Sequence, residues 1–62
     1  MTAKKYKEFT ISKFSDERWW RIFKGEEFIA RTPNEEEARR VIFLNTNQEK
    51  YITDSDMEAV NA

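Results

Sequence analysis

The side chains best suited to chemistry in this 62-residue chain are its acids, because the chain contains neither histidine nor cysteine. Histidine is the usual general acid or base near neutral pH, and cysteine is the usual thiol nucleophile. Hydroxyl groups are present, but a serine or threonine nucleophile needs an adjacent base to activate it. The hydroxyls concerned belong to Thr10, Ser12, Ser15 and Ser55. We therefore expect a protein that is not an enzyme.

Two acidic clusters have the residue types of a metal or proton-transfer site. The run at residues 35–37 (EEE) opens a predicted helix, where consecutive side chains point about 100° apart and cannot converge on one ion. Asp54, Asp56 and Glu58 alternate as in a calcium loop, but the glycine and the distal glutamate of such a loop are missing. The single glycine, Gly25, excludes a glycine-rich phosphate cradle. We expect no metal, no cofactor and no small-molecule substrate.

The length and composition describe a small and marginally stable domain. A chain this short buries only about 60% of its unfolded surface, and this one has no disulfide or zinc ligands to compensate. Without cysteine there is no sign of an oxidising compartment, and the charged N-terminus leads into no apolar signal segment. The longest apolar run, residues 41–44, is too short to cross a bilayer. These features predict a cytoplasmic protein without a membrane partner.

The pattern of apolar residues and turns predicts an α+β fold with three antiparallel strands followed by one helix on one face of the sheet. Residues 6–14 form the first expected strand, and residues 19–24 and 27–31 form a hairpin around Gly25-Glu26 with a type II′ turn. Residues 32–35 (TPNE) have the form of a capping box led by Thr32, which predicts a helix over residues 33–45. The β-β-β-α core would span residues 6–45 of a single domain over residues 1–62, after a mobile N-terminus at residues 1–5.

The C-terminal segment, residues 46–62, is expected to dock loosely on this core. Thr53 has the type of a helix cap, and Ile52 and Met57 have the spacing of a hydrophobic staple, so a short second helix is a possible structure. A helix of this length is not stable alone in water, so the segment is ordered only if it docks.

Adjacent residues on a strand point to opposite sides of a sheet, so the hairpin register sorts the side chains onto two faces. The expected cross-strand pairs are Phe23–Phe28, Ile22–Ile29 and Trp20–Arg31. The first face then holds Phe9, Ile11, Trp20, Ile22 and Ile29. The second holds Thr10, Ser12, Phe14, Trp19, Arg21, Phe23, Phe28 and Ala30. We expect the helix to pack on the first face through Ala38, Val41 and Ile42, although the second face is apolar enough for the reverse arrangement.

The second face carries more aromatic surface than a solvated sheet requires. Contiguous exposed apolar area usually marks an interaction site, and tryptophan and arginine are enriched at binding hot spots. We therefore predict a partner-binding site composed of Phe14, Trp19, Arg21, Phe23 and Phe28. This face has three candidate coverings: the C-terminal segment, a second copy in a homo-oligomer, or a foreign partner.

The charge distribution leaves nucleic acid as a second possible partner. Residues 1–24 contain seven basic and three acidic residues, a net charge of +4, whereas residues 25–62 contain four and nine, a net charge of −5. Basic side chains among aromatic rings are typical of single-strand binding surfaces. The candidate phosphate-binding residues are Lys13, Arg18, Arg21 and Lys24. The cluster Lys4, Lys5 and Lys7 is either a further phosphate-contacting arm or a solubilising chain end.

The stretch WWRIFKGEEFIARTPNEEEARRVI, residues 19–42, is similar in layout to the AP2-type and integrase amino-terminal DNA-binding domains. It has an aromatic strand, a hairpin and an acidic helix start. The resemblance implies a three-stranded sheet whose polar side chains enter the major groove, but those domains are usually basic and this chain has a net charge of −1. We therefore expect a small adaptor or inhibitor-like regulator that binds a protein partner or itself. The alternative is a nucleic-acid-binding accessory protein.

Overall fold

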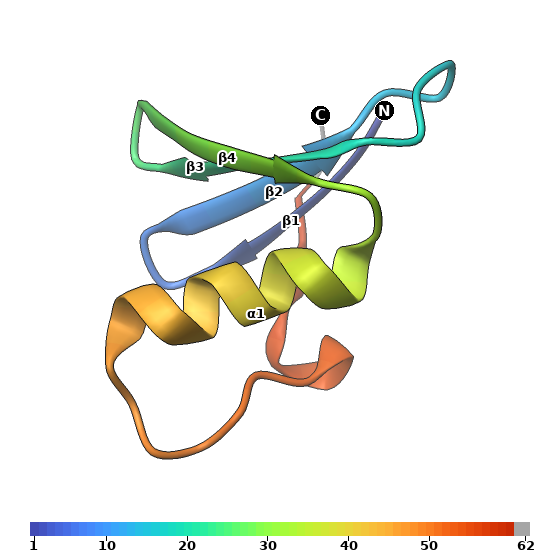
Figure 1. The fold of residues 1–62 in the computed structure, drawn as a ribbon. Coiled ribbons are helices and arrows are strands. Elements are labelled where there is room, and N and C mark those ends of the chain that lie inside the picture. The colour runs from blue at the N-terminus through green and yellow to red at the C-terminus, as the bar shows by residue number, and fades with distance from the viewer. Residues whose placement is uncertain (61–62) are drawn as a thin grey trace.

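Five strands form one antiparallel sheet in the computed structural model, which describes residues 1–60 of the chain (Figure 1). The elements are β1 (Thr2–Tyr6), β2 (Phe9–Lys13), β3 (Trp20–Lys24), β4 (Glu27–Thr32), the helix α1 (Glu35–Thr46), the 3-10 helix η1 (Asp54–Asp56) and β5 (Glu58–Ala59). The strand order is β4-β3-β2-β1-β5, and α1 lies against one face of the sheet. The predicted α+β class is confirmed. The sheet has five strands rather than the predicted three, because β1 and β5 were not predicted.

The additional strand β1 exists because the first expected strand turns back on itself. Tyr6 pairs with Phe9, so Lys7 and Glu8 form a two-residue turn between β1 and β2. Lys7 has a φ of 53°, in the left-handed region that a residue with a Cβ enters at a cost. No glycine or asparagine marks this turn, which is why the sequence pattern missed it. Residues 2–5, expected to be mobile, pair instead with β2.

The second hairpin turns at the predicted position. Phe23 pairs with Phe28, and Lys24 pairs with Glu27. Gly25 has a φ of 61°, a conformation that glycine adopts without a Cβ clash. The prediction of a hairpin around Gly25-Glu26 is therefore confirmed.

Beyond that turn the register shifts, and the predicted pairs further along are wrong. Ile22 pairs with Ala30 rather than Ile29, and Trp20 pairs with Thr32 rather than Arg31. Ile29 is thus the extra residue of a β-bulge in β4.

The bulge changes which side chains of β4 share a face, because one inserted residue reverses the alternation beyond it. Ala30, predicted on the face away from the helix, pairs with Ile22 and packs against the core. Arg31, predicted on the helix side, lies opposite Arg21 on the other face. The second face therefore carries a basic residue that the sequence pattern did not place there.

The helix begins two residues later than predicted, because Asn34 rather than Thr32 is its N-cap. The Asn34 side-chain Oδ1 accepts a hydrogen bond from the Glu37 backbone N–H at 2.8 Å. Thr32 is the last residue of β4, and its hydroxyl donates to the Asn34 carbonyl oxygen at 2.8 Å. The helix ends at Thr46, and the following residue, Asn47, has the φ of 54° that is the left-handed conformation of a C-cap.

The core lies between α1 and the sheet. Its buried side chains are Phe9, Ile11, Ile22, Ala38, Ile42, Ile52 and Met57, and Trp20 packs against them while partly exposed. Since Phe9, Ile11 and Ile22 belong to the predicted first face, the helix covers that face and the reverse arrangement is excluded.

The C-terminal segment completes the core on the helix side. It passes from the end of α1 through η1 and reaches the sheet edge at β1, where Glu58 pairs with Lys5 and Ala59 with Lys4 (Figure 1). Ile52 and Met57 flank η1 and are both buried. The expected short helix is therefore wrong, because the segment has one 3-10 turn followed by a short strand. No helix within residues 1–60 has the length and apolar character needed to span a membrane.

Candidate functional site

The surface richest in exposed aromatic rings is the side of the sheet opposite α1. We name it the outer face and define it by Phe14, Trp19, Arg21, Phe23, Phe28 and Arg31. Three of its rings are well exposed: Trp19 at 38%, Phe14 at 43% and Phe28 at 53% of their full accessible surface. Five of these six residues were predicted from the sequence, and the bulge adds Arg31.

At one end of the outer face, two guanidinium groups lie over two aromatic rings. The Arg21 Cζ atom is 4.9 Å from the centre of the Phe14 ring, and the Arg31 Cζ atom is 4.9 Å from the centre of the Trp19 ring. Cation–π contacts of this kind contribute about 0.5–1 kcal/mol at exposed positions. They also hold the guanidinium groups in place, so we name these four residues the cationic end.

The two arginines of the cationic end differ in their partners. Arg21 forms an ion pair with Glu17, with 2.9 Å between Nη2 and Oε2, and both side chains are about one-third exposed. Arg31 is exposed and forms no ion pair within residues 1–60. Because Arg21 and Arg31 are directly paired across β3 and β4, the outer face carries two like charges side by side.

At the other end of the outer face, Phe23 and Phe28 form an aromatic pair. Their ring centres are 5.7 Å apart and their planes are inclined by 70°, an edge-to-face arrangement. Phe23 is half-buried, whereas Phe28 projects into solvent. We name this pair the apolar end.

The candidate phosphate-binding residues do not form one patch. Lys13 is the last residue of β2 and Arg18 belongs to the segment that joins β2 to β3, beside the cationic end. Lys24 lies at the opposite end of β3, where its Nζ atom is 3.8 Å from Glu8 Oε1. That end also carries Lys7, Glu8 and Glu26 in its turns and Glu27 at the start of β4, so its charge is mixed, whereas basic residues predominate at the cationic end.

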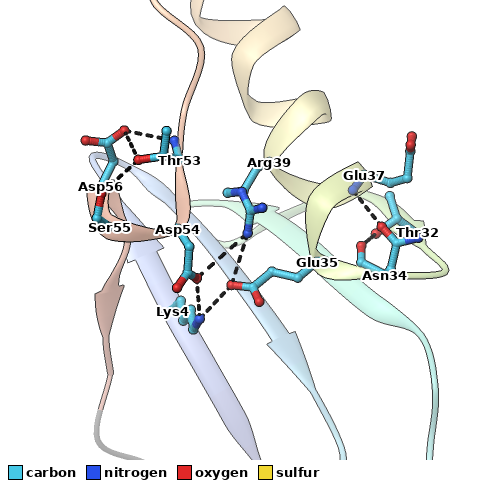
Figure 2. Close-up of polar contacts among 10 residues, drawn as sticks. All are labelled: Lys4, Thr32, Asn34, Glu35, Glu37, Arg39, Thr53, Asp54, Ser55 and Asp56. Atoms are coloured by element: carbon cyan, nitrogen blue, oxygen red, sulfur yellow. Dashed lines mark hydrogen bonds and ion pairs between the residues drawn. The ribbon is translucent and has the colours of Figure 1, made fainter.

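A second charged site lies on the helix side, where four side chains form an ion-pair cluster (Figure 2). Lys4 Nζ is 2.6 Å from Asp54 Oδ1 and 2.7 Å from Glu35 Oε1. Arg39 Nη1 lies 3.5 Å from the same Glu35 oxygen and 3.8 Å from Asp54 Oδ1. The cluster joins β1, the first turns of α1 and η1, so it ties the C-terminal segment to the rest of the fold.

The electrostatics of this cluster favour a structural role. Hydrogen bonds to Asp54 and Glu35 raise the pKa of Lys4 above its ordinary value. The Lys4 ammonium lowers the pKa of Asp54, and in η1, beside the cluster, the backbone N–H of Thr53 lowers the pKa of Asp56. General acid–base catalysis works best with a pKa near the working pH, and all three values move away from neutrality. Of the cluster Lys4, Lys5 and Lys7, Lys4 thus serves the fold.

Residues 46–60 of the C-terminal segment do not cover the outer face. Ile52 and Met57 are buried in the core beneath the sheet, and Tyr51 packs on Phe43 of α1 with 4.8 Å between ring centres. Within residues 1–60, the rings of Phe14 and Trp19 therefore keep their exposure. Of the three coverings considered, two remain: a second copy and a foreign partner.

Comparisons of this chain with protein-family models, curated proteins and solved structures found no match. The residues themselves must therefore suggest the function. Within residues 1–60, no three histidine, cysteine, aspartate or glutamate side chains lie close enough together to hold a metal ion. The outer face is the candidate functional site.

Arg31 is the site residue that sequence reasoning missed. A strictly alternating β4 places it on the helix side, and only the bulge at Ile29 moves it to the outer face. Bulges of this type need no glycine, so no sequence signal marked the position.

Proposed function

We propose that this protein is a small, non-catalytic interaction protein, an adaptor or inhibitor-like regulator, that binds a protein partner through the outer face. The observation that carries the proposal is the exposure of Phe28, Phe14 and Trp19 on a face that the helix leaves uncovered. Aromatic and arginine side chains are the residues most enriched at the energetic centres of interfaces.

The completeness of the core on the other side supports this proposal. Phe9, Ile11 and Ile22 are no more than 1% exposed, because α1 and the C-terminal segment together close that face. The fold therefore does not need the outer rings for its core. Exposed rings of this size are costly in water and raise the risk of aggregation, so a covering partner accounts for them better than chance does.

A second candidate function is binding of single-stranded nucleic acid, which the two arginine–aromatic stacks favour. Aromatic rings with neighbouring cations form the usual platform for unpaired bases. Salt separates the two functions: binding driven by phosphate contacts weakens steeply between about 50 and 200 mM salt. An aromatic protein interface changes little over the same range, because its apolar contacts are not screened.

The proposal is tested by photo-crosslinking in cells that produce the protein. A benzophenone amino acid replaces Phe28 in one variant and Leu44 in a matched control. Leu44 is a good control because it is even more exposed than Phe28, at 70% against 53%, but lies on α1 in the opposite layer. Irradiation should give a discrete adduct with the Phe28 variant and none with the Leu44 variant.

The mass and composition of the adduct decide between the outcomes. A protease-sensitive adduct larger than two copies of the chain supports a foreign protein partner, and one with the mass of two copies supports self-association. A nuclease-sensitive adduct would replace the proposal with the nucleic-acid function. The same adducts from both positions, or none from Phe28, would reject the outer face as a binding surface.

A further inference from the structure

The paired arginines of the outer face are an unusual feature for a sheet that serves only folding. Side chains directly opposite each other on antiparallel strands lie about 5 Å apart, and like charges there are destabilising. Arg21 and Arg31 occupy such a pair, and the ion pair with Glu17 neutralises only Arg21. Features that oppose stability tend to be found at functional sites, so the pair indicates what the outer face recognises.

Resting on the function proposed above, we infer that the outer face binds an acidic and aromatic segment of a foreign protein. A carboxylate of the segment would bind Arg31 at the cationic end, beside the ion pair of Arg21 and Glu17. An aromatic or large aliphatic side chain of the same segment would pack on Phe23 and Phe28 at the apolar end.

The geometry of the cationic end suits carboxylates. A guanidinium group stacked on a ring still has the donor edge that forms paired hydrogen bonds with a carboxylate. Because Arg31 already lies over Trp19, it loses less side-chain freedom when it binds. Arg21 and Phe23 are two residues apart on β3, about 7 Å, which equals the spacing of alternate side chains in an extended peptide.

The charges of the outer face argue against a second copy as the occupant. A two-fold dimer that packs this face on itself with its axis along the strands would bring the arginine pairs of both copies together, and one with its axis across the strands would place them over the aromatic pair of the other copy. The carboxylate nearest to them, Glu17, is already bound to Arg21. Like charges placed opposite each other in an interface select against that partner, often by several kcal/mol.

A nucleic-acid strand fits this face less well than an acidic peptide. A strand that ran along the sheet from the cationic end would meet carboxylates at the apolar end, where Glu8 and Glu26 lie in the turns and Glu27 begins β4, next to Lys7 and Lys24. One side of the Phe14 ring and one side of the Trp19 ring are also occupied by guanidinium groups, which leaves less ring surface for bases. A short acidic segment needs only the local positive charge.

Fluorescence anisotropy with four labelled probes tests the inference on the full chain. The probes are the hexapeptide EEYEEY, its charge-only form EEAEEA, its aromatic-only form QQYQQY, and hexathymidylate as single-stranded DNA. We expect EEYEEY to bind more tightly than each of the other three. In Arg31→Gln its affinity should fall about tenfold, because a charge-assisted hydrogen bond is lost.

The matched control is Arg40→Gln, because Arg40 is an exposed arginine on α1 whose neighbours, Glu37 at 4.0 Å and Tyr51, lie away from the outer face. This variant should change the affinity for EEYEEY less than about twofold, since single surface substitutions away from a site have small effects. Equal losses in the two variants would mean that general charge, not the outer face, attracts the peptide. Thermal unfolding of both variants verifies that the comparison is made on folded protein.

Three other outcomes would overturn the inference. They are the absence of EEYEEY binding to the wild-type chain, equal affinity for QQYQQY, and tighter binding of hexathymidylate that depends on Arg31. The crosslinking experiment separates these failures from failure of the proposed function. If the Phe28 variant forms an adduct with a foreign protein but the wild-type chain does not bind EEYEEY, only the proposed acidic character of the partner is rejected.

Discussion

Both faces of the sheet carry large apolar side chains, but the surroundings of these side chains are very different. On the helix side, Phe9, Ile11 and Ile22 are almost completely buried beneath α1 and the C-terminal segment. On the outer face, Phe14 and Phe28 project into solvent. The comparison shows that apolar content alone does not make a core. A second layer must cover the face, and residues 1–60 supply such a layer on the helix side alone.

The adjacent tryptophans show the same division at the level of single residues. Trp20 lies on the helix side, pairs with Thr32 and packs against the core. Trp19 lies on the outer face beneath the guanidinium group of Arg31. We therefore assign stability to the Trp20 side of the sheet and propose recognition for the Trp19 side.

The largest expected effect compares one phenylalanine from each face. Phe9→Ala should destabilise the fold by about 3–5 kcal/mol, which is most of the stability of a small domain, because Phe9 is only 1% exposed. Phe28→Ala should cost less than about 1 kcal/mol, since only its edge-to-face contact with Phe23 is lost. Denaturant unfolding of both variants measures the difference. Similar losses would show that the outer face also serves the fold.

A second pair of variants asks whether the C-terminal segment belongs to the helix side. Ile52→Ala should cost about 2–4 kcal/mol, because Ile52 is 1% exposed in the core. Val60, which follows β5 and is 40% exposed, is the control, and Val60→Ala should stay within about 1 kcal/mol. If Ile52→Ala unfolded no more easily than the control, the segment would not be part of the core.

A smaller effect on stability is expected at the N-cap of α1, in the layer that covers the helix side of the sheet. Asn34→Ala should cost about 1 kcal/mol, because it leaves the Glu37 backbone N–H without its side-chain acceptor. Asn34→Asp keeps an acceptor and adds a favourable charge at the helix N-terminus, so it should be neutral or stabilising. Thermal unfolding distinguishes the two. A loss of stability in both variants would contradict the assignment of Asn34 as the N-cap.

The ion-pair cluster predicts a pH dependence of the helix side. The pKa of Asp54 is lowered by Lys4. The ionised Asp54 therefore contributes fully to the stability of the fold above the ordinary aspartate pKa of about 3.9, and this contribution is lost as the pH falls through the folded-state pKa. The pKa of Lys4 is raised, so the contribution of Lys4 to the stability of the fold persists at neutral pH and is lost only in strong alkali.

The melting temperature of Asp54→Asn should therefore fall less between pH 6 and pH 2.5 than that of the wild-type chain. Asp56 keeps part of the acid sensitivity, because its pKa is lowered as well. The control is Asp16→Asn, since Asp16 is exposed and forms no ion pair within residues 1–60. If both substitutions reduced the fall in melting temperature equally, net charge rather than the cluster would set the acid sensitivity.

Much of the helix side could be predicted from the sequence. Glycine is the residue type best suited to the positive φ at Gly25, so the turn there could be predicted. The spacing of Ala38 and Ile42 marks the buried side of a helix. These signals are local, so they can be read from a short stretch of sequence. They were sufficient for the α+β class and for the separation of Trp19 from Trp20.

The errors arose where tertiary contacts override local preference. Lys7 occupies a left-handed turn that its own side chain disfavours, because pairing of β1 with β2 compensates for the strain. The bulge at Ile29 follows from how β4 pairs with β3 and leaves no mark in composition. That single inserted residue decides the side on which Arg31 lies, and so the chemistry of the outer face.

The central claim, that the outer face binds while the helix side folds, is tested most directly by the two tryptophan indole N–H signals in a proton–nitrogen NMR titration with EEYEEY. Each signal reports on one face of the sheet. We predict that the Trp19 indole signal shifts in proportion to bound peptide while the Trp20 signal stays in place. A shift of the Trp20 signal equal to that of Trp19, or no shift of either, would contradict the division between the two faces.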